Sequence, residues 1–179
     1  MHDTKVNIVL YFAIIGLGLA ICFMSFAADV PVNFHGTISS SACSINNTET
    51  SQTVALGTVS ATSLAQAGAL SPAKTFNIVI QCPSGGPSQA TVTFTGTADN
   101  KDSTLLAIDP GTGTASGVAI NIADHLNTKI NFGTPSATQS LVAGSNTLTF
   151  VARYQSTVPR SEITPGVANG TAQFTLNYP

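Results

Sequence analysis

The sequence has 179 residues, of which 8% are charged, and its formal net charge at pH 7 is −2. A chain of this length holds one domain, or one domain with a short extra segment. Its six lysines and arginines are too few for the basic patch that binds nucleic acids. The polar residues are instead largely Ser, Thr, Asn and Gln, a composition typical of strands with one buried face and one hydrated face.

Residues 1–27 have the pattern of a secretory signal peptide. An apolar stretch follows Lys5, and the small residues Ser25 and Ala27 occupy the −3 and −1 positions of a signal-peptidase site. We therefore expect cleavage after Ala27 and a mature chain of residues 28–179. The alternative is an uncleaved membrane anchor, because the apolar stretch is close to the roughly 17–25 residues that cross a bilayer.

Alternation of apolar and polar residues predicts strands through most of the mature chain. The expected strands cover residues 30–38, 76–82, 91–95, 118–122, 147–154 and 171–178. Loops rich in Gly, Pro, Asn and Asp separate them, and only residues 60–68 have a pattern compatible with a helical turn or two. Many short alternating strands in one domain predict an all-β fold, a β-sandwich of immunoglobulin-like kind.

Cleavage would remove Cys22 and leave two cysteines, Cys43 and Cys82. In an exported chain, two cysteines most simply form one disulfide bond. Cys82 shares the inward parity of its strand with Ile78 and Ile80, which is where a buried bridge belongs. A metal site or a redox pair is the alternative, but neither cysteine is part of a CxxC motif and neither has a histidine near it.

The two end strands of the mature chain differ from the others. We expect no later strand to cover the outer edge of the last one, which would leave unpaired backbone groups and an apolar groove. The alternating segment 28–38, at the other end, would fill such a groove in another copy by β-strand addition. The alternative is that Phe174, Leu176 and Tyr178 belong to the ordinary core of a complete sandwich.

The sequence has no convergent set of catalytic residues. His125 follows Asp124, but neighbouring residues of a strand point to opposite faces and no GxSxG motif is present. We interpret Asp99 and Asp102 as a hydrated hairpin tip rather than a cation site, and residues 111–117 as a loop rather than a phosphate cradle. We therefore predict no enzymatic activity, no metal site and no cofactor.

The mature chain resembles the pilin subunits of chaperone–usher fimbriae of the type 1 and P pilus kind. Residues 28–38, followed by Cys43, are similar to the N-terminal extension of these pilins. Residues 165–179 are similar to their C-terminal motif, with Tyr178 in the penultimate position and Gly166 fourteenth from the end. The likeness extends to both cysteines and to two central strands, and so covers essentially the whole mature chain.

This resemblance implies an incomplete immunoglobulin-like β-sandwich that lacks its final strand and is completed by donor-strand exchange. Residues 28–38 would be the donor-strand extension and residues 39–179 the pilin domain. The implied donor residues are Val30, Val32, Phe34, Gly36 and Ile38. The implied acceptor groove and C-terminal motif contain Gly166, Phe174, Leu176 and Tyr178.

The resemblance also implies partners and a route through the cell. A periplasmic chaperone would lend a strand until, at the outer-membrane usher, the extension of a neighbouring pilin subunit replaces it. The protein would then reach the cell-surface fimbrium through the periplasm and contribute to cell adhesion. Two residues depart from the expected pattern: Pro31 cannot donate a ladder hydrogen bond, and Pro179 alters how the terminal carboxylate is presented.

A second function is compatible with the sequence, namely a single-domain tip adhesin or adaptor that binds a host-surface glycan or protein. Two-domain adhesins of this family place a lectin domain before the pilin domain, and they lack an alternating donor extension. The mature chain leaves no space for a lectin domain and has such an extension. Binding through surface loops of a single domain stays an alternative.

Overall fold

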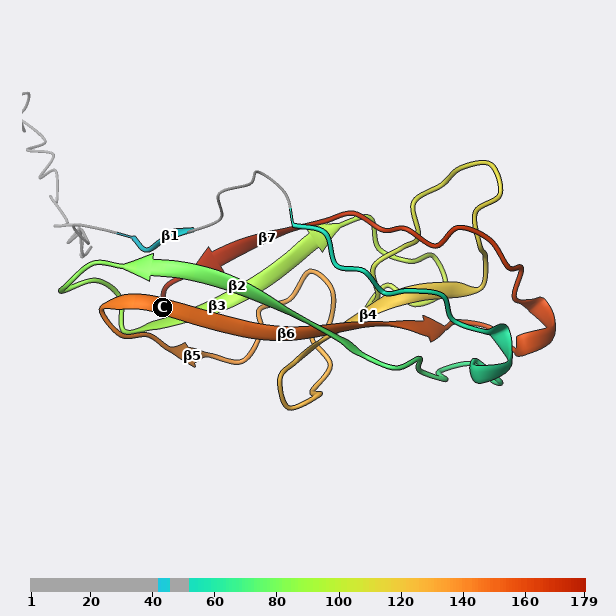
Figure 1. Cartoon of the computed structure of the whole chain (residues 1–179), viewed down its shortest axis with the longest axis horizontal. Coiled ribbons are helices and arrows are strands. Elements are labelled where there is room, and N and C mark those ends of the chain that lie inside the picture. Colours follow the sequence, from blue (N-terminus) through green and yellow to red (C-terminus); the bar gives the residue numbers. More distant parts are fainter. Residues whose placement is uncertain (1–41, 46–51) are drawn as a thin grey trace, which may run out of the picture. The chain divides into compact units, whose positions relative to one another are not determined.

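The computed structural model describes residues 42–45 and 52–179, which form two antiparallel sheets (Figure 1). One sheet has the strand order β1-β2-β6-β4 and the other has the order β5-β3-β7. The strands are β1 (Ser44–Ile45), β2 (Lys74–Cys82), β3 (Gln89–Gly96), β4 (Val118–Asp124), β5 (Gln139–Ser140), β6 (Gly144–Ser156) and β7 (Ala172–Asn177). Two short 3-10 turns complete the described part, η1 (Ala61–Ser63) and η2 (Arg160–Glu162).

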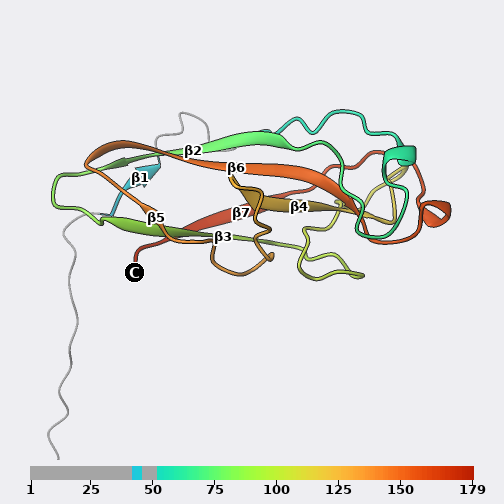
Figure 2. The same ribbon diagram turned by 90° about the horizontal axis from the view of Figure 1, so that it is seen from below.

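The two sheets lie as two facing layers, with β2, β6 and β4 in one and β3 and β7 in the other (Figure 2). The predicted all-β class is therefore confirmed. Among the described residues, no helix has the length and apolarity needed to cross a membrane. The predicted signal peptide of residues 1–27 and the predicted strand of residues 30–38 lie outside the described residues.

Alternation along the strands builds the core between the layers. In β2, Ile78 and Ile80 are buried, whereas Asn77 and Gln81 on the opposite parity are exposed. Phe150 of β6 is fully buried and stands at the centre of an aromatic cluster. Its ring centroid lies 5.7 Å from that of Phe76 in β2 and 5.2 Å from that of Phe94 in β3. These contacts join the two sheets, because Phe94 belongs to the opposite layer.

Strand β4 differs from the alternating pattern, because six of its seven residues are buried on both faces. Both edges of β4 are also paired. One edge pairs with β6, and the other receives two isolated bridges, from Leu106 to Ile120 and from Lys129 to Ala123. Both partners of the second edge come from loops, so local periodicity does not reveal them.

Residues 60–68 contain the single short turn η1. The Oγ of Ser60 caps it by accepting a hydrogen bond of 3.2 Å from the backbone N–H of Thr62.

Candidate functional site

An apolar groove of about 930 Å³ lies between residues 52–57 and residues 168–174. Its floor consists of inward side chains from four strands of both sheets. These floor residues include Phe76, Ile78, Phe94, Ile120, Ile122, Ala152 and Tyr154. The groove therefore lies over the same apolar face that forms the core, and most of its floor side chains are themselves buried.

A second hollow of about 510 Å³ adjoins the first. The two share four lining residues, Gly57, Tyr154, Ala168 and Asn169. The second hollow continues between residues 58–61 on one side and residues 163–167 on the other. The two hollows thus follow the same pair of chain segments.

The first wall of the groove, residues 167–171, is fixed by hydrogen bonds from alternate residues. Val167 donates its N–H to Gly113 and accepts from Ala115 at 2.8 Å, and the carbonyl of Asn169 accepts from the N–H of Asp109 at 2.7 Å. In an extended segment, neighbouring residues direct their backbone groups to opposite edges. The backbone groups of Ala168 and Gly170 therefore face the groove.

Tyr154 supports this geometry from the groove floor. Its hydroxyl donates a hydrogen bond of 2.8 Å to the carbonyl oxygen of Ala168. Burial raises the pKa of the Tyr154 hydroxyl above its ordinary value of 10.0, so the group stays protonated and able to donate at neutral pH.

Strand β7 continues this wall and has one free edge. It pairs with β3 from Ala172 to Asn177, with Phe174 opposite Phe94. The described residues contain no strand that pairs with the other edge of β7. An edge strand of this kind offers a row of unpaired backbone groups.

The second wall, residues 52–57, is strand-like in its side chains but not in its pairing. Val54 and Leu56 are half-buried against the core, whereas Thr53 and Ala55 are exposed. Within the described residues, no backbone hydrogen bond joins residues 53–59 to a neighbouring strand. Among the described residues, the groove is therefore bordered on one side by residues 53–57 and on the other by the outer edge of β7, and neither pairs with a strand, as expected of a slot for one additional strand.

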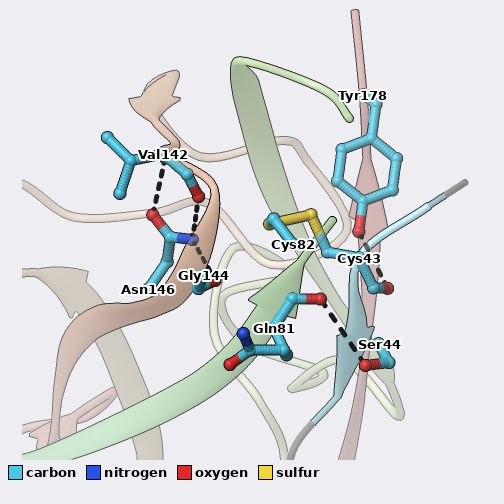
Figure 3. The surroundings of a disulfide bond; sticks show 8 residues. All are labelled: Cys43, Ser44, Gln81, Cys82, Val142, Gly144, Asn146 and Tyr178. Atoms are coloured by element: carbon cyan, nitrogen blue, oxygen red, sulfur yellow. Dashed lines mark hydrogen bonds between the residues drawn. A yellow bond between two sulfur atoms is a disulfide. The ribbon is translucent and has the colours of Figure 1, made fainter. Parts of the chain in front are cut away.

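The disulfide bond joins Cys43, just before β1, to Cys82, the last residue of β2 (Figure 3). Both cysteines are buried. The hydroxyl of Tyr178 donates a hydrogen bond of 3.4 Å to the carbonyl oxygen of Cys43. The residue that follows β7 thus contacts the disulfide from the opposite sheet.

The other predicted groove residues occupy different places along the same segment. Phe174 lines the first hollow and Gly166 the second. Leu176 and Tyr178 are half-buried against the core and do not line either hollow. The predicted donor residues Val30, Val32, Phe34, Gly36 and Ile38 lie outside the described residues.

The sequence did not single out the second wall or Tyr154 as parts of the site. A signal for the wall was present, because Val54 and Leu56 alternate with Thr53 and Ala55. No local pattern distinguishes Tyr154 from other core-facing residues of its strand, since its role depends on the distant carbonyl of Ala168.

None of the charged residues in the described part of the chain lines the groove. Lys129 forms an ion pair of 3.5 Å with Asp102, and hydrogen bonds from Thr104 together with this lysine lower the pKa of the Asp102 carboxyl. His125 is exposed in the loop after β4. Across residues 42–45 and 52–179, no group of His, Cys, Asp and Glu has the arrangement of a metal site.

The model of the fimbrial protein family matches residues 32–179 of this chain. The chain belongs to the fimbrial protein family. Over 152 residues it is 38% identical to the fimbrial subunit type 1 of Salmonella typhimurium, covering 82% of this chain and 81% of that protein. Over 157 residues it is 34% identical to a probable major fimbrial subunit of Escherichia coli O157:H7, covering 87% of each.

Solved structures of fimbrial proteins have the same fold. The P pilus rod subunit PapA is 26% identical, with a TM-score of 0.62 over 76% of this chain and 99% of that chain. An antigen and type I fimbria protein of Burkholderia pseudomallei is 36% identical, with a TM-score of 0.59 over 76% of this chain and 88% of that chain. The predicted pilin family and the immunoglobulin-like fold are confirmed. The protein is a structural subunit of a bacterial surface fimbria.

Proposed function

We propose that this fimbrial subunit polymerises by donor-strand exchange, with its groove accepting residues 28–38 of a neighbouring subunit. The observation that carries the proposal is the apolar groove, which lies between residues 53–57 and the outer edge of β7, two segments that pair with no strand among the described residues. A groove lined by apolar side chains marks a surface where a partner can bury further apolar area, and that burial contributes favourable free energy. One added β-strand would pair with the walls and cover the floor at once.

The extension has the side-chain pattern that such a groove requires. Val30, Val32, Phe34 and Ile38 share one parity, so a strand would direct all four toward the floor. Gly36 has the same parity and would direct no side chain toward the floor. Pro31 has no N–H to donate, so we expect ladder pairing to begin at Val32.

The size of the apolar contribution supports assembly rather than a stable lone subunit. Burying four large apolar side chains contributes about 6–12 kcal/mol before entropy and strain, at roughly 1.5–3 kcal/mol each. The net stability of a whole domain is about 5–15 kcal/mol. A subunit with an empty groove is therefore expected to be marginally stable and prone to aggregate.

A temporary occupant of the groove follows from this marginal stability. We infer that a periplasmic chaperone covers the groove after export and that an outer-membrane usher hosts the exchange with the next subunit. The signal peptide of residues 1–27 would direct the chain to the periplasm. Contact of the finished fimbria with other cells would give the subunit a role in adhesion.

A variant lacking residues 28–38 tests whether the extension is the donor. It keeps its groove and should still accept a strand, but it should not insert into another subunit. We expect no fimbriae by electron microscopy when this variant is the only subunit, and shortened fimbriae when it is mixed with the wild-type subunit. Fimbriae of normal length from the variant alone would refute donation by this segment.

A further inference from the structure

We propose that Asp109 is a positioning residue for strand acceptance, because it orients the groove wall around Gly170. The inference rests on the proposed function, since it assigns Asp109 a part in presenting the wall to an incoming strand. Asp109 is not in the groove itself. It lies behind the wall, on the side away from the occupant, and acts through residues 169–171.

Asp109 makes three hydrogen bonds to the wall. Its backbone N–H donates to the carbonyl oxygen of Asn169 at 2.7 Å. Its carboxylate accepts from the N–H of Thr171 at 3.3 Å and from the hydroxyl of Thr171 at 2.8 Å. One residue therefore fixes both peptide groups that flank Gly170.

The planarity of the peptide bond converts these contacts into an orientation of Gly170. In a trans peptide, the N–H and the C=O point in opposite directions. The carbonyl of Asn169 points to Asp109, so the N–H of Gly170 points to the groove. The N–H of Thr171 also points to Asp109, so the C=O of Gly170 points to the groove as well.

The hydrogen bonds of Asp109 orient the wall residue that has the largest backbone freedom. Glycine has the largest backbone freedom, and Gly170 lines the groove. A side chain cannot replace it, because a Cβ would lie 2.7 Å from Cδ1 of Ile120 and 2.9 Å from the carbonyl oxygen of Ala107. The wall must therefore use glycine here and must obtain its rigidity from a neighbour.

Asp102 provides a matched control for the carboxylate. It accepts hydrogen bonds from the N–H and the hydroxyl of Thr104, the same pair of donors that Thr171 gives to Asp109. Neither Asp102 nor Thr104 lines the groove or its wall. Asp102→Ala therefore measures the loss of a similar aspartate–threonine contact, together with the ion pair to Lys129, without a change at the wall.

The test compares fimbriae assembled from the full chain and from the Asp109→Ala, Asp109→Asn, Thr171→Val and Asp102→Ala variants. The readout is the rate at which subunits dissociate in a fixed concentration of denaturant. Because hydrogen bonds to charged groups are among the stronger ones, Asp109→Ala should dissociate at least about tenfold faster than the wild type. Asp109→Asn, which keeps an acceptor for Thr171, should recover most of the loss, and Asp102→Ala should stay near the wild type.

Thr171→Val is an independent test of the same contact, because it keeps the side-chain shape and removes only the hydroxyl. We expect an intermediate rate for it, and no added effect when it is combined with Asp109→Ala. If Asp109→Ala yields no fimbriae, Thr171→Val carries the test. Equal dissociation rates for Thr171→Val and the wild type would then overturn the inference.

Amide hydrogen exchange separates positioning from general stability. In Asp109→Ala fimbriae, exchange should accelerate at residues 168–171 and stay unchanged in β6. Equal acceleration in β6 would mean that Asp109 stabilises the domain as a whole, and would overturn the inference. A different result would contradict the proposed function itself, and therefore also this inference. That result is equal amide exchange rates at residues 168–171 in wild-type fimbriae and in the variant lacking residues 28–38.

Discussion

At Gly166, the chain passes so close to the backbone of residues 113–115 that it leaves no space for a side chain. A Cβ there would lie 2.6 Å from the nitrogen of Ala115 and would collide with the carbonyl oxygen of Gly113. This close approach follows from the bridge between Thr114 and Val167, which anchors the start of the groove wall. The position thus needs glycine for packing.

Gly166→Ala is therefore expected to destabilise the subunit by about 1–3 kcal/mol, the usual cost of overpacking. The measurement is the free energy of unfolding in urea. Gly111→Ala is the matched control, because the nearest atom to its Cβ would be Oγ1 of Thr114 at 3.2 Å, which a small side-chain rotation relieves. Equal stabilities of the two variants would contradict this account of Gly166.

Among single residues, those with local signals could be predicted from the sequence. Cys43 and Cys82 follow from the count of cysteines left after export, and Phe174 follows from alternation near the chain end. Asp109 and Tyr154 could not be found in this way. Each acts on a partner that is distant in sequence, 62 residues away for Asp109 and 14 residues away for Tyr154.

At the scale of elements, alternation predicted the long strands well. Strands β2, β3, β4 and β6 contain the expected segments, although β6 begins three residues earlier, at Gly144, and β7 is one residue shorter at each end than the expected 171–178. The two-residue strands β1 and β5 were missed, because a pair of residues has no period. The groove itself was not visible in the sequence beyond its last strand, since residues 52–57 reach it only in the folded domain.

The two faces of β7 give a direct prediction for the groove. Phe174 is half-buried and lines the groove, whereas its neighbour Thr175 is exposed on the outer face. Phe174→Ala should reduce the affinity for the donated strand, because it removes aromatic contact area from the wall of the groove. Thr175→Ala should have little effect.

The measurement for this pair is the yield of fimbriae per cell and their dissociation temperature in denaturant. We expect a lower yield and a lower dissociation temperature for Phe174→Ala only. A comparable loss for Thr175→Ala would show that β7 matters through its backbone pairing with β3 rather than through its groove face.

At the scale of the whole molecule, the described domain has two facing sheets, but an open groove remains between residues 52–57 and residues 168–174. The hydrogen bond from the Tyr178 hydroxyl to the carbonyl oxygen of Cys43 connects the two sheets near the end of β7, and the aromatic cluster joins them at the centre. Between these points and the second wall, the floor of the groove stays open. The domain therefore has a folded framework that one strand from outside would complete.

The most direct measurement of this central claim is the thermal unfolding of the variant lacking residues 28–38, with and without a synthetic peptide of residues 28–38. We predict a saturable rise in the unfolding temperature, because a ligand at 100 times its Kd stabilises the folded state by about 2.7 kcal/mol. The same peptide with Phe34→Asp should give a much smaller rise. An unfolding temperature that neither peptide changes would contradict completion of the domain by a neighbour's strand.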